Sequence, residues 1–127
     1  MNPYVKADSI IGSGEEMGET KVKTAITKEG KKIEWRHPGG KFRRLGPRHC
    51  TEAELLAIIL GSGSAGRSAE QIAKEVFDRY HSLIGIMGKT LGELMEIKGL
   101  KIVKATRIAA CLEIARRIGK NLEKRQE

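Results

Sequence analysis

Basic residues gathered around a glycine turn are the part of this sequence best suited to chemistry, and the chemistry they suit is phosphate binding. Four cations surround Gly99, namely Lys98, Lys101, Lys104 and Arg107, and no acidic residue occurs between positions 97 and 112. The apolar spacing around Gly99 predicts two helices joined by a tight turn. The first amides of the second helix then lack partners within it and carry the positive end of the helix dipole. Together these groups predict contacts with DNA backbone phosphates, which do not read base sequence.

The residues inside the turn have expected packing roles. Gly99 permits the change of direction, Leu100 fills the angle between the helices, and the small Ala105 lets them approach closely. The usual helix-hairpin-helix motif has a second glycine where this chain has Lys101. If that position requires a positive φ, a lysine there costs about 1 kcal/mol. Two interpretations stay open: a hairpin that binds phosphate, and a well-packed helix pair whose lysines are only solvated.

An earlier segment repeats the hairpin pattern. With a shift of 38 positions, Leu56, Ile59 and Gly61 align with Leu94, Ile97 and Gly99. Gly63 then occupies the second glycine position. The repeat predicts a double hairpin with a longer turn in its first copy. Arg67, at the end of that longer turn, is a further candidate phosphate contact.

A second basic segment lies between positions 35 and 51, where no acidic residue occurs. Its cations are Arg36, Lys41, Arg43, Arg44 and Arg48. Two interpretations are open: a second set of phosphate contacts that includes Arg43 and Arg44, or a solvated connector. The run Pro38-Gly39-Gly40 argues against a rigid presentation of these side chains.

The remaining residue types do not assemble a catalytic or metal site. His49, Cys50 and Cys111 lack a fourth ligand and any recognisable metal spacing. No serine has the sequence context of a nucleophile, and the glycine-rich segment 61–66 follows a helix where a dinucleotide site needs a strand. We therefore expect a protein that is not an enzyme and that needs neither a metal nor a cofactor.

Helix signals dominate the sequence after position 50. Capping boxes open three helices, at Thr51-x-x-Glu54, Ser68-x-x-Gln71 and Thr90-x-x-Glu93. The first is expected to end at Leu60 and the second at about Tyr80. A short helix is expected around residues 82–87, and a long one from Ile102 to about Ile118. The expected fold class is mainly α, a compact helix-hairpin-helix bundle of about five helices.

The first 37 residues differ from the rest. Residues 10–16 have the character of a flexible lead, residues 20–27 alternate like a strand, and Ile33 with Trp35 suits a returning strand. Two strands alone are marginally stable, so the alternatives are a small β-hairpin over residues 20–35 and a disordered basic segment. The expected organisation is an extension over 1–37, a helix-hairpin-helix domain over 38–120 and a charged tail over 121–127.

Composition narrows the class of protein. The 127 residues include 24 Lys and Arg against 16 Asp and Glu, a net charge of +8, which favours a polyanionic partner. Aromatic residues make up only 4%, too few for a platform that stacks nucleic-acid bases. No apolar run approaches the roughly 20 residues that span a membrane, and no signal peptide opens the chain. We therefore expect a cytoplasmic protein without membrane contact.

Several of these segments together resemble the amino-terminal domain of the RadC family. The resemblance rests on Lys41–Pro47, Thr51–Gly63, Ser82-Leu83 and Ile97–Arg117, and it covers about residues 38–118. It implies an all-α helix-hairpin-helix module from a bacterial family historically labelled DNA repair.

The resemblance also implies that this chain lacks a domain that other members of the family contain. Members of this family normally continue into a JAMM-type, metalloprotease-like domain with a His-x-His-Pro zinc motif, which this sequence does not contain. The chain is thus expected to be either a fragment or a naturally short relative, with no peptidase or metal role. The expected partner is DNA; the alternative is a scaffold that binds a JAMM-type domain or another protein and no DNA.

Overall fold

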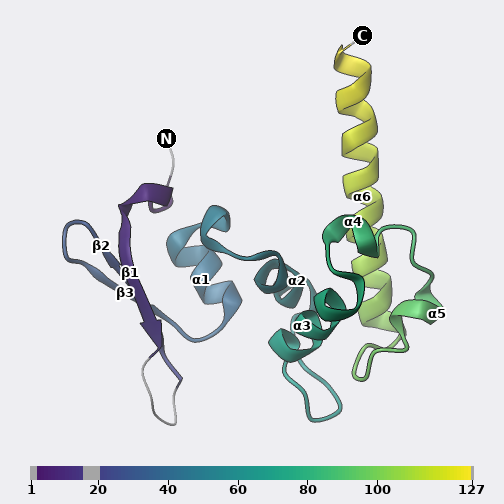
Figure 1. The fold of residues 1–127 in the computed structure, drawn as a ribbon, viewed down its shortest axis with the longest axis horizontal. Coiled ribbons are helices and arrows are strands. Elements are labelled where there is room, and N and C mark those ends of the chain that lie inside the picture. The colour runs from purple at the N-terminus through teal and green to yellow at the C-terminus, as the bar shows by residue number, and fades with distance from the viewer. Residues whose placement is uncertain (1–2, 16–20, 127) are drawn as a thin grey trace. The chain divides into compact units, whose positions relative to one another are not determined.

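The structure is a computed structural model that describes residues 3–15 and 21–126. Its contacts divide the chain into two compact units, residues 1–55 and residues 56–127, which we call the N-terminal and C-terminal units (Figure 1). Glu16 and Thr20, which bound the predicted flexible lead and strand, lie outside the described residues, as does Glu127 at the end of the predicted tail.

The N-terminal unit is built on a three-stranded antiparallel sheet in the order β1-β2-β3. Its elements are a 3₁₀ turn η1 (Ala7–Ser9), β1 (Ile10–Glu15), β2 (Lys23–Thr27), β3 (Lys32–Trp35), α1 (Pro38–Leu45) and a second 3₁₀ turn η2 (Pro47–His49). Ala25 of β2 is paired with Ile33 of β3. Ala25, Trp35 and Leu45 form the buried core, which places α1 against the sheet.

The predicted fold class is wrong, because the described residues contain this sheet together with six helices and the fold is mixed α/β. β2 and β3 occupy the segment 20–35 for which a hairpin was one of two alternatives. The strand β1 was missed, since Gly12, Ser13 and Gly14 give no alternating pattern. Hydrogen bonding to β2 holds this segment extended, with Ser13 opposite Ala25. A third strand removes the instability of an isolated hairpin.

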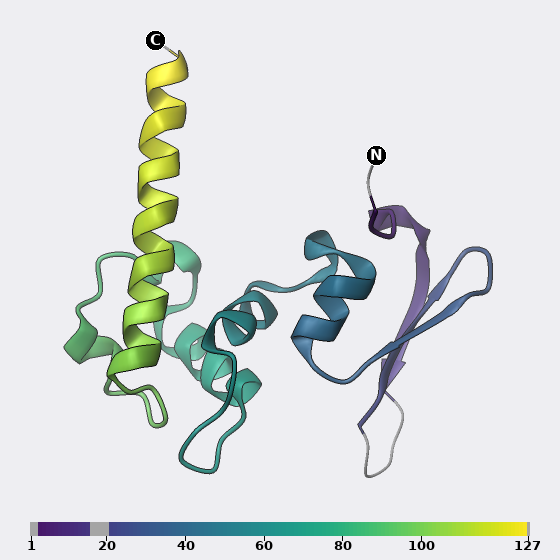
Figure 2. The same cartoon turned by 180° about the vertical axis from the view of Figure 1, so that it is seen from behind.

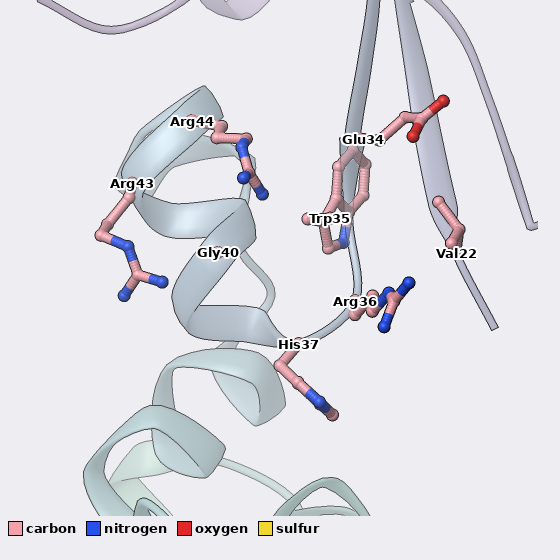
Figure 3. A pocket seen from close by; sticks show the side chains of 8 residues that line it. All are labelled: Val22, Glu34, Trp35, Arg36, His37, Gly40, Arg43 and Arg44. Carbon is pink, nitrogen blue, oxygen red and sulfur yellow. The ribbon is translucent and has the colours of Figure 1, made fainter. Parts of the chain in front are cut away.

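Helix α1 begins where the sequence argued against rigid structure (Figure 3). Pro38 stands in its first turn, where the fixed φ of proline suits a helix and its missing N–H is not needed. Gly40 brings the helix close to the sheet: a Cβ placed on it would lie 3.4 Å from the Cβ of Trp35. Tertiary contact with β3 therefore compensates for two residues of low helix propensity.

The C-terminal unit is helical. α2 (Glu52–Leu60) spans the division between the units, and α3 (Ala69–Tyr80), α4 (Leu83–Ile86), α5 (Leu91–Leu94) and α6 (Ile102–Gln126) follow. The predicted starts of these helices are confirmed, with both hydrogen bonds of the capping box present at Thr51, Ser68 and Thr90. The core includes Leu60, Ile72, Ile97, Leu100 and Ile108, each at most 1% exposed.

The predicted end of the last helix near Ile118 is wrong, because α6 continues to Gln126. Figure 2 shows its C-terminal half extending past the other helices of its unit. A single glycine inside a helix costs only about 1 kcal/mol, so Gly119 does not stop it. Glu113 accepts hydrogen bonds from Arg116 and Arg117 one turn later, which lowers the pKa of its carboxyl to about 2. These pairs lie before Gly119 and favour continuation of the helix.

Glu54 connects α1 to the start of α2. Its carboxylate accepts from the Lys41 ammonium at 3.0 and 3.1 Å and from the Thr51 amide at 2.9 Å. Burial acts to raise the pKa of Glu54, but the hydrogen bonds from Thr51 and Lys41 outweigh it, so the pKa lies below its ordinary value of 4.5. The ionised form therefore stabilises the folded N-terminal unit.

This shift predicts a pH-dependent stability. A lowered folded-state pKa gives a stabilisation that is complete above pH 4.5 and is lost as the pH falls through the folded-state value. We expect Glu54→Gln to be less stable than the parent at pH 7 and the difference to shrink in acid. Denaturant unfolding followed by the fluorescence of Trp35, the single tryptophan, measures it. Glu52→Gln, an exposed change in the same turn, is the control; an equal acid response in both variants would contradict the assignment.

Candidate nucleic-acid interface

The second hairpin consists of α5, the turn at residues 95–101 and the start of α6. Gly99 has a φ of +92°, and the Leu100 amide closes the turn on the Ile97 carbonyl at 3.0 Å. Leu100 is 1% exposed and Ala105 is fully buried. The packing roles predicted for Gly99, Leu100 and Ala105 are confirmed.

Lys101 carries no backbone strain. Among the described residues other than glycine, positive φ occurs at Lys21, Ala65 and His81 only. The cost considered for a lysine in the second glycine position therefore does not arise. The Lys101 carbonyl instead accepts the first hydrogen bond of α6, from the Ala105 amide at 2.9 Å.

The N-terminus of α6 is open to solvent. The amides of Ile102, Val103 and Lys104 precede the first donor of the helix and have no acceptor within it. Lys98 and Lys101 beside them are exposed, and neither ammonium has a partner in the described part of the chain. Two cations and three amides thus lie at the positive end of a 25-residue helix, an arrangement that attracts an anion.

The first hairpin also turns at a glycine with a positive φ. Gly61, which the 38-residue repeat aligns with Gly99, has a φ of +77°. Its longer loop is closed by backbone hydrogen bonds between Ser64 and Arg67 at 3.0 and 3.1 Å. Gly63 is required there, because a Cβ would lie 1.9 Å from the Arg67 carbonyl oxygen.

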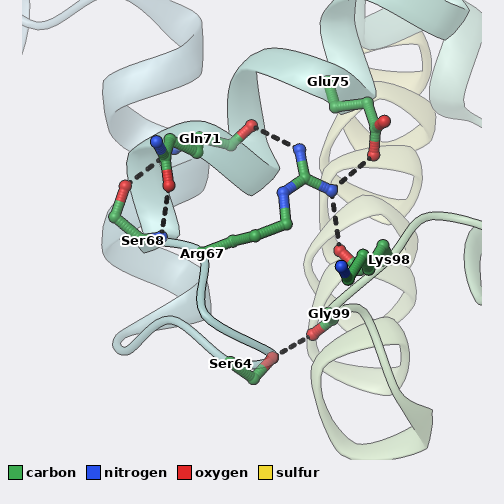
Figure 4. Close-up of polar contacts among 7 residues, drawn as sticks. All are labelled: Ser64, Arg67, Ser68, Gln71, Glu75, Lys98 and Gly99. Carbon is green, nitrogen blue, oxygen red and sulfur yellow. Dashed lines mark hydrogen bonds and ion pairs between the residues drawn. The ribbon is translucent and has the colours of Figure 1, made fainter.

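Arg67 points into the protein rather than toward solvent (Figure 4). One nitrogen of its guanidinium donates at 2.9 Å both to the Glu75 carboxylate and to the carbonyl oxygen of Lys98. The Ser64 hydroxyl donates to the carbonyl of Gly99. The loop of the first hairpin is therefore bound to the turn of the second.

Two other predicted contact residues, both in the second hairpin, donate hydrogen bonds to backbone carbonyls of the first hairpin. Arg107 donates to the carbonyl of Leu60 at 3.4 Å, and Lys104 donates to that of Gly63 at 3.2 Å. Leu60 and Lys98 occupy equivalent positions, each directly before its hairpin glycine. Each of these two carbonyls thus accepts from an arginine of the other hairpin.

The predicted contact residues therefore fall into four groups. Lys98 and Lys101 lie at the start of α6 beside its open amides, whereas Gly99 and Leu100 form the buried turn and the Leu100 amide is bonded to the Ile97 carbonyl. Arg67, Lys104 and Arg107 cross-link the hairpins. Arg43 and Arg44 are exposed on α1, in the N-terminal unit. Sequence reasoning missed Ser64 and Glu75, since nothing local marks them as partners of groups in or beside a distant turn.

No group of three or more His, Cys, Asp or Glu side chains within residues 3–15 and 21–126 is placed to hold a metal ion. Burial and the neighbouring Glu54 raise the pKa of the Cys50 thiol, which disfavours a reactive thiolate. None of the helices in those ranges is long and apolar enough to cross a bilayer.

The fold and the site define a class: a small α/β protein in which a double helical hairpin follows a three-stranded sheet. A family profile described as UPF0758 N-terminal matches residues 33–106, more than half of the chain. The chain belongs to the UPF0758 family, and the resemblance to the amino-terminal region of the RadC family is confirmed.

Individual relatives agree with this assignment. A UPF0758 protein of Pasteurella multocida is 39% identical over 80 residues, which are 63% of this chain and 36% of that protein. One of Methylibium petroleiphilum is 40% identical over 80 residues, 63% of this chain and 36% of that protein. One of Bordetella petrii is 38% identical over 90 residues, 71% of this chain and 40% of that protein. The chain thus spans well under half the length of these relatives. No solved structure matches it.

The contacts at Gly99 predict a sharp effect of substitution. A Cβ there would lie 2.9 Å from Ile72 Cδ1 and 3.1 Å from the Ser64 carbonyl oxygen, at a φ that disfavours side chains. We expect Gly99→Ala to lower the free energy of unfolding by about 2–4 kcal/mol. Gly119→Ala is the matched control: its added methyl group would meet no atom within 4 Å, so it should stabilise α6 by about 1 kcal/mol. Chemical denaturation followed by circular dichroism measures the free energy of unfolding of both variants. If both substitutions changed it in the same direction, the packing described at Gly99 would be contradicted.

Proposed function

We propose that the double hairpin binds the backbone phosphates of duplex DNA without reading base sequence. The observation that carries this proposal is the open N-terminus of α6, where Lys98 and Lys101 are exposed and, among the described residues, unpaired beside three amides without acceptors in the helix. A phosphate there would accept from these amides and lie at the positive end of the helix dipole. No acidic residue between positions 97 and 112 opposes it.

The cross-links between the hairpins support the same function indirectly. Arg67 and Ser64 hold the carbonyls of Lys98 and Gly99, so the turn that presents the amides is fixed before a ligand arrives. A preorganised site loses less conformational freedom on binding. Arg67, Lys104 and Arg107 act in this proposal by positioning the turn, and Lys98 and Lys101 make the contacts.

Charge reversal tests the proposal. Lys98→Glu with Lys101→Glu should weaken binding to a fluorescent duplex at least tenfold at low salt, and should lower the salt slope by about 2. Lys120→Glu with Lys124→Glu makes the same change in net charge on exposed residues near the other end of α6 and should have a much smaller effect. Fluorescence anisotropy with two unrelated duplex sequences measures both variants. No binding by the parent chain at low salt, or equal losses in both variants, would refute the proposal.

A second candidate, a scaffold that binds another protein domain, is favoured by the exposed apolar stripe of α6. Ile114, Ile118 and Leu122 recur every four residues and are 60%, 54% and 52% exposed. Such a stripe on a helix is suited to packing against a partner. The longer relatives supply a candidate partner, because most of their length lies outside the match. Neither candidate requires a catalytic step in this chain.

Association experiments separate the two candidates. Calorimetric titration of the chain with the unmatched part of the Bordetella petrii relative should show binding if the scaffold function holds. Ile118→Glu with Leu122→Glu should abolish that binding and leave DNA binding unchanged. Lys98→Glu with Lys101→Glu should weaken DNA binding and leave the binding of that part unchanged. Absence of any association with that part would refute the scaffold candidate.

A further inference from the structure

An open cavity of about 320 Å³ lies between the end of β3 and the first turns of α1, within the N-terminal unit (Figure 3). We call it the Trp35 cavity. The lining residues that matter here are Trp35, Arg36, His37, Gly40, Arg43 and Arg44. Its volume is at the lower end of the range of small-molecule sites.

The Trp35 cavity carries positive charge without a counterion in the described part of the chain. Arg36, Arg43 and Arg44 are all exposed, and none has a carboxylate partner among the described residues. The carboxylate on the lining, Glu34, is paired with the ammonium of Lys32 at 3.3 Å. Three arginines on the lining of one concavity favour an anionic ligand, and planar guanidinium donors suit phosphate oxygens. Figure 3 shows the Arg44 side chain between α1 and Trp35, and that of Arg43 on the other side of the helix.

A buried hydrogen-bond donor also lacks a partner. Trp35 is only 5% exposed, and its indole Nε1 makes no hydrogen bond to any described residue. Figure 3 shows the nitrogen-bearing ring of the indole at the end that faces Arg36. Buried N–H groups are nearly always paired, so this one points to an acceptor supplied by a ligand.

The start of α1 adds further donors. The first donor within the helix is the Lys41 amide, which reaches the His37 carbonyl at 3.1 Å, so the amides of Gly39 and Gly40 have no acceptor in the helix. His37 precedes the helix without capping it through its side chain. Unlike the turn at Gly99, this helix start lies beside a cavity and a buried donor that no described residue satisfies.

The two glycines let the arginines fold back over this helix start. A Cβ on Gly39 would lie 3.4 Å from a guanidinium nitrogen of Arg43, and one on Gly40 would lie 3.4 Å from a guanidinium nitrogen of Arg44. Cations near the positive end of a helix are electrostatically unfavourable by themselves. An anion bound between them is attracted both by the guanidinium groups and by the positive end of the helix, which relieves this repulsion.

We propose that the Trp35 cavity binds a phosphate group through the indole N–H of Trp35, the open amides of α1 and the guanidinium group of Arg44, while Arg43 adds positive charge beside the same helix start. The phosphate belongs either to a small phosphorylated molecule or to a DNA backbone. The site is separate from the hairpins and does not rest on the function proposed for them. Pro38-Gly39-Gly40 is then a ligand cradle rather than a flexible connector.

Titration of the full chain tests this site through Trp35. Addition of inorganic phosphate or pyrophosphate should move the indole N–H resonance of Trp35 and change its fluorescence saturably, relative to sodium chloride at equal ionic strength. Arg43→Gln with Arg44→Gln should weaken this binding at least tenfold. Lys28→Gln with Arg48→Gln removes the same charge from exposed residues of the unit that do not line the cavity, and should leave binding within about twofold. Gly39→Ala should weaken binding while the chain stays folded by circular dichroism.

A duplex DNA titration distinguishes the two sources of phosphate. If the ligand is a backbone phosphate, DNA moves the Trp35 resonance and inorganic phosphate competes; if it is a small molecule, pyrophosphate moves the resonance and DNA does not. The variant Lys98→Glu with Lys101→Glu should respond to phosphate like the parent chain, so failure of the hairpin proposal leaves this one standing. No Trp35 response beyond that to sodium chloride, or equal affinity in the Arg43/Arg44 and control variants, would overturn it.

Discussion

The exchange of hydrogen bonds between the two glycine turns is the interaction on which the rest of the C-terminal unit depends. A helix that ends in a tight turn leaves carbonyl oxygens without helical partners. Arg107 supplies a donor to the carbonyl of Leu60, and Arg67 supplies one to that of Lys98. Each hairpin therefore completes the other, and the absence of a side chain at Gly99 allows the necessary contact with Ser64 and Ile72.

This exchange also determines which positive charges have a hydrogen-bond partner within the unit. The net charge of +8 says nothing about direction, and the basic residues around Gly99 look alike in the sequence. Arg67, Lys104 and Arg107 donate to backbone carbonyls of the unit, whereas the ammonium groups of Lys98 and Lys101 have no partner among the described residues. The proposed phosphate-binding role therefore rests on fewer side chains than the local charge suggests, and the other cations hold the backbone of the two turns.

The N-terminal unit differs from the C-terminal unit because its core is small and some of its polar groups have no partner among the described residues. Ala25, Trp35 and Leu45 bury the contact between sheet and helix, and Lys41 lies over the Trp35 ring at 5.5 Å from its centroid. The same indole keeps an N–H that no described residue accepts. An unpaired buried donor beside uncompensated arginines is costly in a unit of this size. That cost distinguishes a ligand site from an ordinary basic surface.

Local chemistry in the sequence determined where the helices of the C-terminal unit begin and which residues fill the second turn. Capping boxes at Ser68 and Thr90 and the glycine at position 99 act through neighbours within a few residues, so their roles were predictable. Only the tertiary structure decided that β1 and α1 exist and that Arg67 points inward. Those outcomes depend on tertiary contacts, with β2 for β1, with Trp35 of the sheet for α1 and with the carbonyl of Lys98 for Arg67, and these contacts outweigh weak local preferences.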